Sequence, residues 1–177
     1  MRYVALVRGI NVRGKKLAMA DLRAMLGDLG HEDVATYVQS GNAVFSSERE
    51  DPAELAAEIE EGIAAKLGLD VRVMVRTAPE IAAVIAGNPF PDADANPRRV
   101  HVVFLEREPD PERLAQIDPC QYEPDEFRIG DRTVYLRFPD GYHTAKLTND
   151  FWERRLGMAG TARNWNTVMK INQMLAP

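Results

Sequence analysis

The order of the predicted elements indicates an α+β fold in two halves. Short β-rich segments alternate with amphipathic helical segments along the whole chain. In the first half their order is β-α-β-β-α-β, the ferredoxin-like arrangement in which two helices cover one face of a four-stranded antiparallel sheet. A proline-rich stretch over residues 88–92 then interrupts the chain near its midpoint. The sequence therefore predicts two packed α+β subdomains.

The first half contains four strand-like segments and two amphipathic helices. The strands are rich in β-branched and aromatic residues and cover residues 3–7, 34–38, 43–46 and 71–75. The first helix spans residues 20–29 and ends at Gly30. The second begins after Asp51, which can cap it, with proline at its first position, and it ends at Gly68. The two middle strands form a hairpin.

The second half is predicted to be an altered copy of the first. Thr77 and Glu80 form a capping box for a short helix that leads into the proline-rich stretch. The elements beyond it are strands over residues 100–105, 127–129 and 134–138 and helices over 110–117, 147–156 and 164–175. No fourth strand is evident. We therefore divide the chain into a ferredoxin-like subdomain, residues 1–88, and a second α+β subdomain, residues 89–177, whose C-terminal helix packs on the first.

Composition excludes several classes of function. The chain of 177 residues has a formal charge of -5, from 27 acidic and 22 basic residues, so no global field attracts it to nucleic acid or anionic lipid. One cysteine excludes an internal disulfide and a multi-cysteine zinc site, and no metal or cofactor is predicted. The chain has no leader-like start and no apolar run long enough to span a bilayer, so we expect a cytoplasmic protein that does not enter the membrane.

The segment from Arg8 to Lys16 is the first candidate binding site. It directly follows a strand and lacks one residue of a phosphate-binding P-loop, because Lys16 stands where a Ser or Thr would hold magnesium. Gly9 and Gly14 permit unusual backbone dihedrals, and Lys15 with its neighbours can neutralise an anion. The alternative is a glycine-kinked connection in which an asparagine bonds its own backbone and the lysines are solvated.

The hairpin connection Gln39-Ser40-Gly41-Asn42 is the second candidate. It can present a hydroxyl and amides to a ligand, or it can be a plain turn in which Gly41 supplies the positive dihedral. Ser40 has no partner at a recognisable spacing. Of the histidines, His101 lies in an apolar strand, and His143, in a loop, is the better candidate for proton chemistry.

The third candidate is the segment 161–167. We expect Thr161 to cap the last helix, which places Arg163 and Asn164 in its first turn beside Trp165. A helix start favours phosphate or carboxylate. The alternative is a polar network that pins this helix to the first half.

Four motifs resemble one known family. They are Arg8-Gly9-Ile10-Asn11-Val12, Gln39-Ser40-Gly41-Asn42, Lys146-Leu147-Thr148-Asn149 and Thr161-Ala162-Arg163-Asn164-Trp165-Asn166-Thr167-Val168. Together they are similar to the signature of DUF1697, a bacterial family of unknown function. The resemblance implies a small cytoplasmic α+β protein with ferredoxin-like architecture and no established activity or cofactor. The family usually has glycine where Arg13 stands, so either the loop is less tight here or a cation has been added.

We therefore expect a protein that binds a phosphorylated small molecule, a nucleotide or another anion. The candidate ligand-binding residues are Arg8, Gly9, Asn11, Gly14, Lys15, Lys16, Gln39, Ser40, Asn42, Lys146, Arg163 and Asn164. Two alternatives stay open: a transferase or hydrolase acting on an anionic substrate through Ser40 or His143, and purely structural polar motifs. RNA is a weaker candidate partner, because only Tyr3 and Phe45 are available on the first and third strands to stack on bases.

Overall fold

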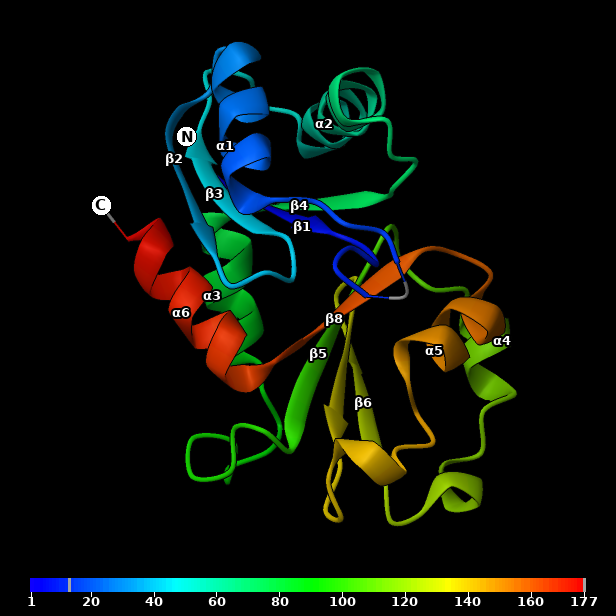
Figure 1. The fold of residues 1–177 in the computed structure, drawn as a ribbon. Coiled ribbons are helices and arrows are strands. Elements are labelled where there is room, and N and C mark those ends of the chain that lie inside the picture. Colours follow the sequence, from blue (N-terminus) through cyan, green and yellow to red (C-terminus); the bar gives the residue numbers. More distant parts are fainter. Residues whose placement is uncertain (13, 177) are drawn as a thin grey trace. The chain divides into compact units, whose positions relative to one another are not determined.

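The computed structural model describes residues 1–12 and 14–176 (Figure 1). The chain divides into two compact units, one formed by Met1–Ala82 with the end of the chain from Lys170 onward, the other by Ala83–Met169. Each unit contains one four-stranded antiparallel sheet with helices packed on it. The predicted α+β class is confirmed. Arg13, where the family resemblance predicts glycine, lies outside the described residues.

The first unit has the predicted β-α-β-β-α-β order. Its elements are β1 (Arg2–Val7), α1 (Met19–Asp28), β2 (Glu32–Tyr37), β3 (Asn42–Ser46), α2 (Pro52–Leu67) and β4 (Val73–Thr77). The strands lie side by side in the order β2-β3-β1-β4, and every neighbouring pair is antiparallel. The two central strands are therefore the first and third in sequence.

The local signals of the first unit act as expected. Asp51 caps α2 by accepting a hydrogen bond from Ala53 N at 2.8 Å, and Gly68 ends the helix with a φ of 68°. Figure 1 shows α1 and α2 on the same face of the sheet. Alternate residues of β1, Tyr3, Ala5 and Val7, pack with both helices in one apolar core.

The second unit has the same topology as the first. Its elements are β5 (Val100–Leu105), α4 (Pro111–Ala115), a 3₁₀ turn (Pro119–Tyr122), β6 (Glu126–Gly130), β7 (Thr133–Arg137), a 3₁₀ turn (Tyr142–Thr144), α5 (Asn149–Leu156) and β8 (Gly160–Asn164). The sheet order is β6-β7-β5-β8, so each strand occupies the place of its counterpart in the first unit.

The expectation that the second half lacks a clear fourth strand was wrong. Residues 160–164 form β8, which pairs with β5 along its whole length. The sequence of this segment does not predict a strand because it has no alternating apolar pattern. Its buried positions are polar instead: Thr161 is 3% and Arg163 6% exposed. Pairing with β5 forms this strand despite its weak β propensity.

The fourth strands of the two units share one arrangement. Arg76 in β4 stands opposite Val4 of β1, and Arg163 in β8 stands opposite Val102 of β5. Both arginines are buried. Each strand passes directly into a helix, α3 (Ala78–Ala86) or α6 (Trp165–Leu175), which continues from one unit into the other.

The residue after each arginine caps the helix that follows. Thr77 Oγ1 accepts a hydrogen bond from Glu80 N at 3.2 Å, while Glu80 Oε2 accepts one from Thr77 N at 2.7 Å, so the predicted capping box is confirmed. Asn164 Oδ1 accepts from Thr167 N at 2.9 Å. The prediction that Thr161 caps the last helix was therefore wrong, because Thr161 lies inside β8 and the helix begins at Trp165.

None of the helices described here combines the length and the apolar character needed to cross a membrane. Cys120 is exposed and is not part of a disulfide.

Candidate functional site

The glycine loop, residues 8–16, begins where β1 ends. Its backbone turns through left-handed residues at Gly9, Asn11 and Gly14, with φ values of 68°, 56° and 91°. Asn11 N donates to Lys15 O, and Lys15 N donates to Val12 O at 3.4 Å, which closes a small β-bridge. Two of the loop amides are thus used within the loop.

The side chain of Asn11 holds the loop to its neighbours. Its Oδ1 accepts from Leu17 N at 2.9 Å, and its Nδ2 donates to Leu17 O at 2.9 Å and to Gln39 O. The amide is therefore committed to three protein partners. Asn11, one of the predicted ligand-binding residues, thus joins the glycine loop to the hairpin turn.

The hairpin turn, residues 38–41, lies against the glycine loop. Val7 N donates to Gly41 O at 2.8 Å, and a Cβ added to Gly41 would stand 2.7 Å from Ile10 Cδ1. Glycine is needed here both for this close approach and for its φ of 80°. The first two predicted motifs are therefore brought together in the first unit.

Val38 is the strained residue of this turn. It has a φ of 50°, a conformation that a β-branched side chain rarely adopts, and it is 49% exposed. Asn42 is buried, and its Nδ2 donates to Tyr37 O and to Ser40 Oγ, both at 3.0 Å. Asn42 and Ser40 thus stabilise the turn, with Ser40 Oγ as the acceptor of the bond from Asn42.

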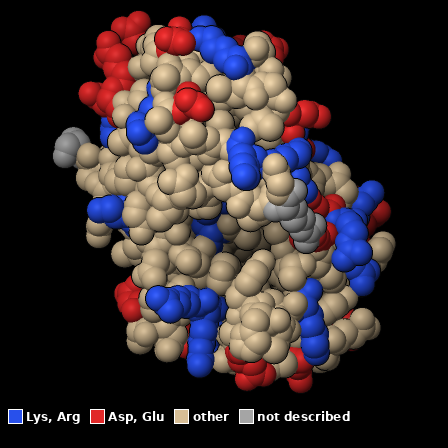
Figure 2. All heavy atoms as spheres, viewed as in Figure 1, with Lys and Arg blue, Asp and Glu red and all other residues tan. Residues whose placement is uncertain are grey.

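Positive charge stands at the rim of the loop. Lys15 and Lys16 are exposed, and Lys15 Nζ donates to Asp70 O at 2.8 Å. Arg8 is half-buried. Figure 2 shows basic side chains in several separate groups on the face viewed there, with acidic groups among them.

The remaining predicted site residues belong to the second unit. Lys146 Nζ donates to Glu123 O at 2.8 Å, and its backbone N donates to the buried carboxylate of Asp125 at 2.6 Å. Arg163 Nη1 donates to Thr161 Oγ1 at 2.6 Å and to Ala162 O at 2.8 Å. Burial lowers the pKa of Arg163 to about 10.

Two other sequence hypotheses can be checked. Tyr3 and Phe45 are fully buried in the core with α1 and α2, so neither ring can stack on an RNA base. His101 is stacked on Tyr142, with ring centroids 4.9 Å apart, and packs edge-on against Phe138. Burial lowers the pKa of His101 to about 4, as expected for a histidine within a sheet.

Sequence reasoning missed a second polar cluster, formed by His31, Arg49 and Glu58. Glu58, on α2, contacts His31 Nε2 at 3.4 Å and Arg49 Nη2 at 2.9 Å. The three residues come from separate elements, so no sequence motif joins them. Among the described residues, no group of His, Cys, Asp and Glu side chains is arranged to hold a metal.

The sequence profile of a family described as "Protein of unknown function (DUF1697)" matches residues 1–135. The chain belongs to this family. No curated protein matches it. It is similar in structure to the protein described as "The structure of conserved bacterial protein SP0830 from Streptococcus pneumoniae", with a TM-score of 0.78 and 27% sequence identity, over 99% of this chain and 98% of that one. The predicted DUF1697 membership is thus confirmed, and the likeness extends over both units.

Proposed function

We propose that this protein binds a phosphorylated small molecule or another small anion at the surface formed by the glycine loop and the hairpin turn. The observation that carries the proposal is left-handed backbone at two non-glycine residues, Asn11 and Val38, on segments that the Asn11 amide ties together. Asparagine tolerates this conformation, whereas for the β-branched Val38 it costs about 1–3 kcal/mol, and such strain concentrates at functional sites. A simple connection between β1 and α1 requires neither.

The cationic groups define the ligand. Lys15 is held at the rim by Asp70 O, which places its ammonium group beside the loop. Lys16 adds a second charge where a P-loop would have its magnesium-binding hydroxyl. The proposed site therefore binds its anion by charge and hydrogen bonding without a bridging magnesium ion. Arg8, Gly9, Gly14, Gln39 and Ser40 complete the proposed surface, whereas Asn11 and Asn42 maintain its shape.

Lys146, Arg163 and Asn164 have a structural role in this proposal. Lys146 bonds Glu123 O, Arg163 bonds Thr161 within its own strand, and Asn164 caps α6. A cytoplasmic location belongs to the same proposal, because a free exposed cysteine suits a reducing compartment.

The test is a thermal-shift and calorimetric titration with inorganic phosphate, glucose 6-phosphate and ATP, in low salt and without added metal. A ligand present at a hundred times its dissociation constant stabilises a protein by about 2.7 kcal/mol. The informative variant is Lys15→Ala/Lys16→Ala. Its control is Lys66→Ala/Lys170→Ala, which removes the same charge from other exposed positions of the first unit.

We expect the loop variant to weaken binding at least tenfold at low ionic strength, and by less as salt is added. The control should bind nearly as the parent protein does. Absence of binding by all three probes, or equal weakening in both double variants, would overturn the proposal.

A further inference from the structure

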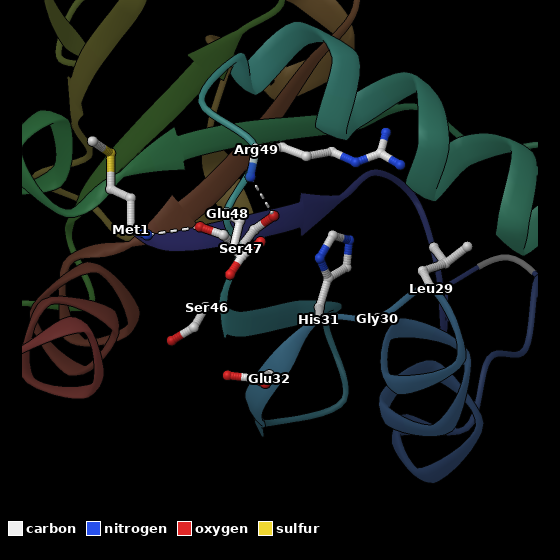
Figure 3. A pocket seen from close by; sticks show the side chains of 9 residues that line it. All are labelled: Met1, Leu29, Gly30, His31, Glu32, Ser46, Ser47, Glu48 and Arg49. Atoms are coloured by element: carbon white, nitrogen blue, oxygen red, sulfur yellow. Dashed lines mark hydrogen bonds between the residues drawn. The ribbon is translucent and has the colours of Figure 1, made fainter.

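The first unit contains a pocket of about 490 Å³ near the start of β2. His31, Glu32, Glu48 and Arg49 line it together with Ser46 and Ser47 (Figure 3). In Figure 3 the imidazole ring of His31 stands between Leu29 on one side and the Ser46–Arg49 segment on the other. None of these residues belongs to the glycine loop or the hairpin turn.

The imidazole of His31 is held firmly. Its side chain is only 3% exposed, and its ring lies against Phe45 with centroids 4.7 Å apart. Nε2 and Glu58 Oε2 are both buried, 3.4 Å apart, and neither makes a hydrogen bond within the described residues. Two buried acceptors facing each other would repel, so the proton of the neutral ring belongs on Nε2, where it points at the carboxylate.

The other ring nitrogen is then an acceptor. Burial is the largest effect on the pKa of His31 and lowers it, although the carboxylate of Glu58 acts in the opposite direction. The ring is therefore neutral near pH 7. His31 lines the pocket while Nε2 is buried against α2, so Nδ1 is the nitrogen that a ligand can reach. A carboxylate that fixes the tautomer of a histidine in this way prepares its second nitrogen for a hydrogen-bond donor.

The charges around the pocket favour a cation. Arg49 is paired with Glu58, and the amino group of Met1 donates to Ser47 O at 2.7 Å. Glu32 and Glu48 are exposed carboxylates on the same rim. Two exposed carboxylates thus stand on the rim, and the cationic groups of the lining, Arg49 and the Met1 amino group, are already engaged.

We propose that this pocket binds a small organic ammonium ion, with His31 Nδ1 accepting an N–H hydrogen bond and Glu32 and Glu48 supplying the opposite charge. The ligand class is a primary amine of a few carbons, because its ammonium group carries both the N–H donor and the positive charge. This site is separate from the proposed anion site, and neither proposal depends on the other.

The test is an NMR titration of the imidazole nitrogens with ethanolamine and putrescine, with sodium acetate as an anionic probe. We expect Nε2 to carry the proton in the free protein and the Nδ1 resonance to shift on addition of either amine, while the exposed His143 does not respond. Acetate should leave Nδ1 unchanged.

Two matched double variants test whether the carboxylates of the pocket rim bind the amine. Glu32→Gln/Glu48→Gln should weaken amine binding about tenfold at low salt, because each exposed carboxylate contributes up to about fivefold. Glu54→Gln/Glu61→Gln removes the same charge from exposed positions of α2 and should have little effect. A proton on Nδ1, a shift caused by acetate rather than amines, or no shift with either amine at tens of millimolar would overturn the inference.

Discussion

Replacing Asn11 tests whether one side chain holds the candidate anion site together. Its amide makes three hydrogen bonds, two with the peptide groups of Leu17 and one with Gln39 O. A neutral hydrogen bond contributes about 0.5–1.5 kcal/mol net, and since Asn11 is exposed, water can replace part of each bond. The side chain therefore contributes about 2 kcal/mol. A left-handed backbone conformation is about 1 kcal/mol less favourable for alanine than for asparagine.

Asn11→Ala should thus lower the free energy of unfolding by about 3 kcal/mol. Asn11→Gly loses the same hydrogen bonds but adopts the φ of 56° without strain, so it should cost about 2 kcal/mol. The order of the two variants separates the backbone contribution from the side-chain contribution. Urea unfolding followed by circular dichroism gives the global free energies.

Hydrogen exchange provides the local measurement. Leu17 N donates to Asn11 Oδ1, so its amide should exchange about thirtyfold faster in Asn11→Gly if about 2 kcal/mol is lost locally. Val103, in β5 of the second unit, provides a reference amide. Unchanged protection of Leu17, or a loss below about 0.5 kcal/mol in both variants, would show that Asn11 does not hold the loop.

Three further outcomes are expected. Gly41→Ala should lower the free energy of unfolding in urea by about 3 kcal/mol or more, because its Cβ would lie less than 3 Å from neighbouring side chains. Gly68→Ala has a similar positive φ but open space around it, so it should lower that free energy by about 1 kcal/mol. Equal losses in the two variants would contradict the packing argument. The pKa of His101 is lowered to about 4 in the folded protein, so between pH 6.5 and 4 the unfolded chain binds a proton that the folded one does not. The free energy of unfolding should therefore fall by roughly 2–3 kcal/mol as pH falls through this range, and His101→Phe should not show this pH dependence. If the free energies of unfolding of variant and parent differ by the same amount at every pH, His101 is not the group responsible. Arg137→Gln should return the pKa of Asp92 toward its ordinary value in a carboxyl NMR titration, because the Arg137 guanidinium hydrogen-bonds Asp92 Oδ2 and lowers that pKa. The stabilisation from this pair is present above the ordinary pKa and is lost as pH falls through the lowered pKa. A titration of Asp92 that is the same in the variant and the parent would exclude this cause.

Local physical signals predicted much of the fold from the sequence. The strand over residues 100–105 has the predicted bounds, and the capping of α2 by Asp51 and of α3 by Thr77 with Glu80 follows directly from residue types at fixed spacing. Such signals act within one helical turn or one strand, so they need no knowledge of the rest of the chain.

Part of the candidate site was predictable for the same reason. The glycines of the loop and the turn mark positive φ by residue type. The residue type of Val38 does not predict a positive φ, because a β-branched residue favours extended backbone. Its left-handed conformation is evident only in the folded hairpin turn.

The tertiary structure decided the rest. Segment 160–164 becomes a strand because β5 offers it a pairing edge, and this removes Arg163 from the helix start where the sequence placed it. His31 and Glu58 meet across 27 positions of the chain through the packing of α2, although neither stands in a motif. Sequence alone determined which segments are helical, extended or turning, because those preferences arise between near neighbours. Which polar groups are buried, and against which partners, depends on contacts made only when distant segments pack.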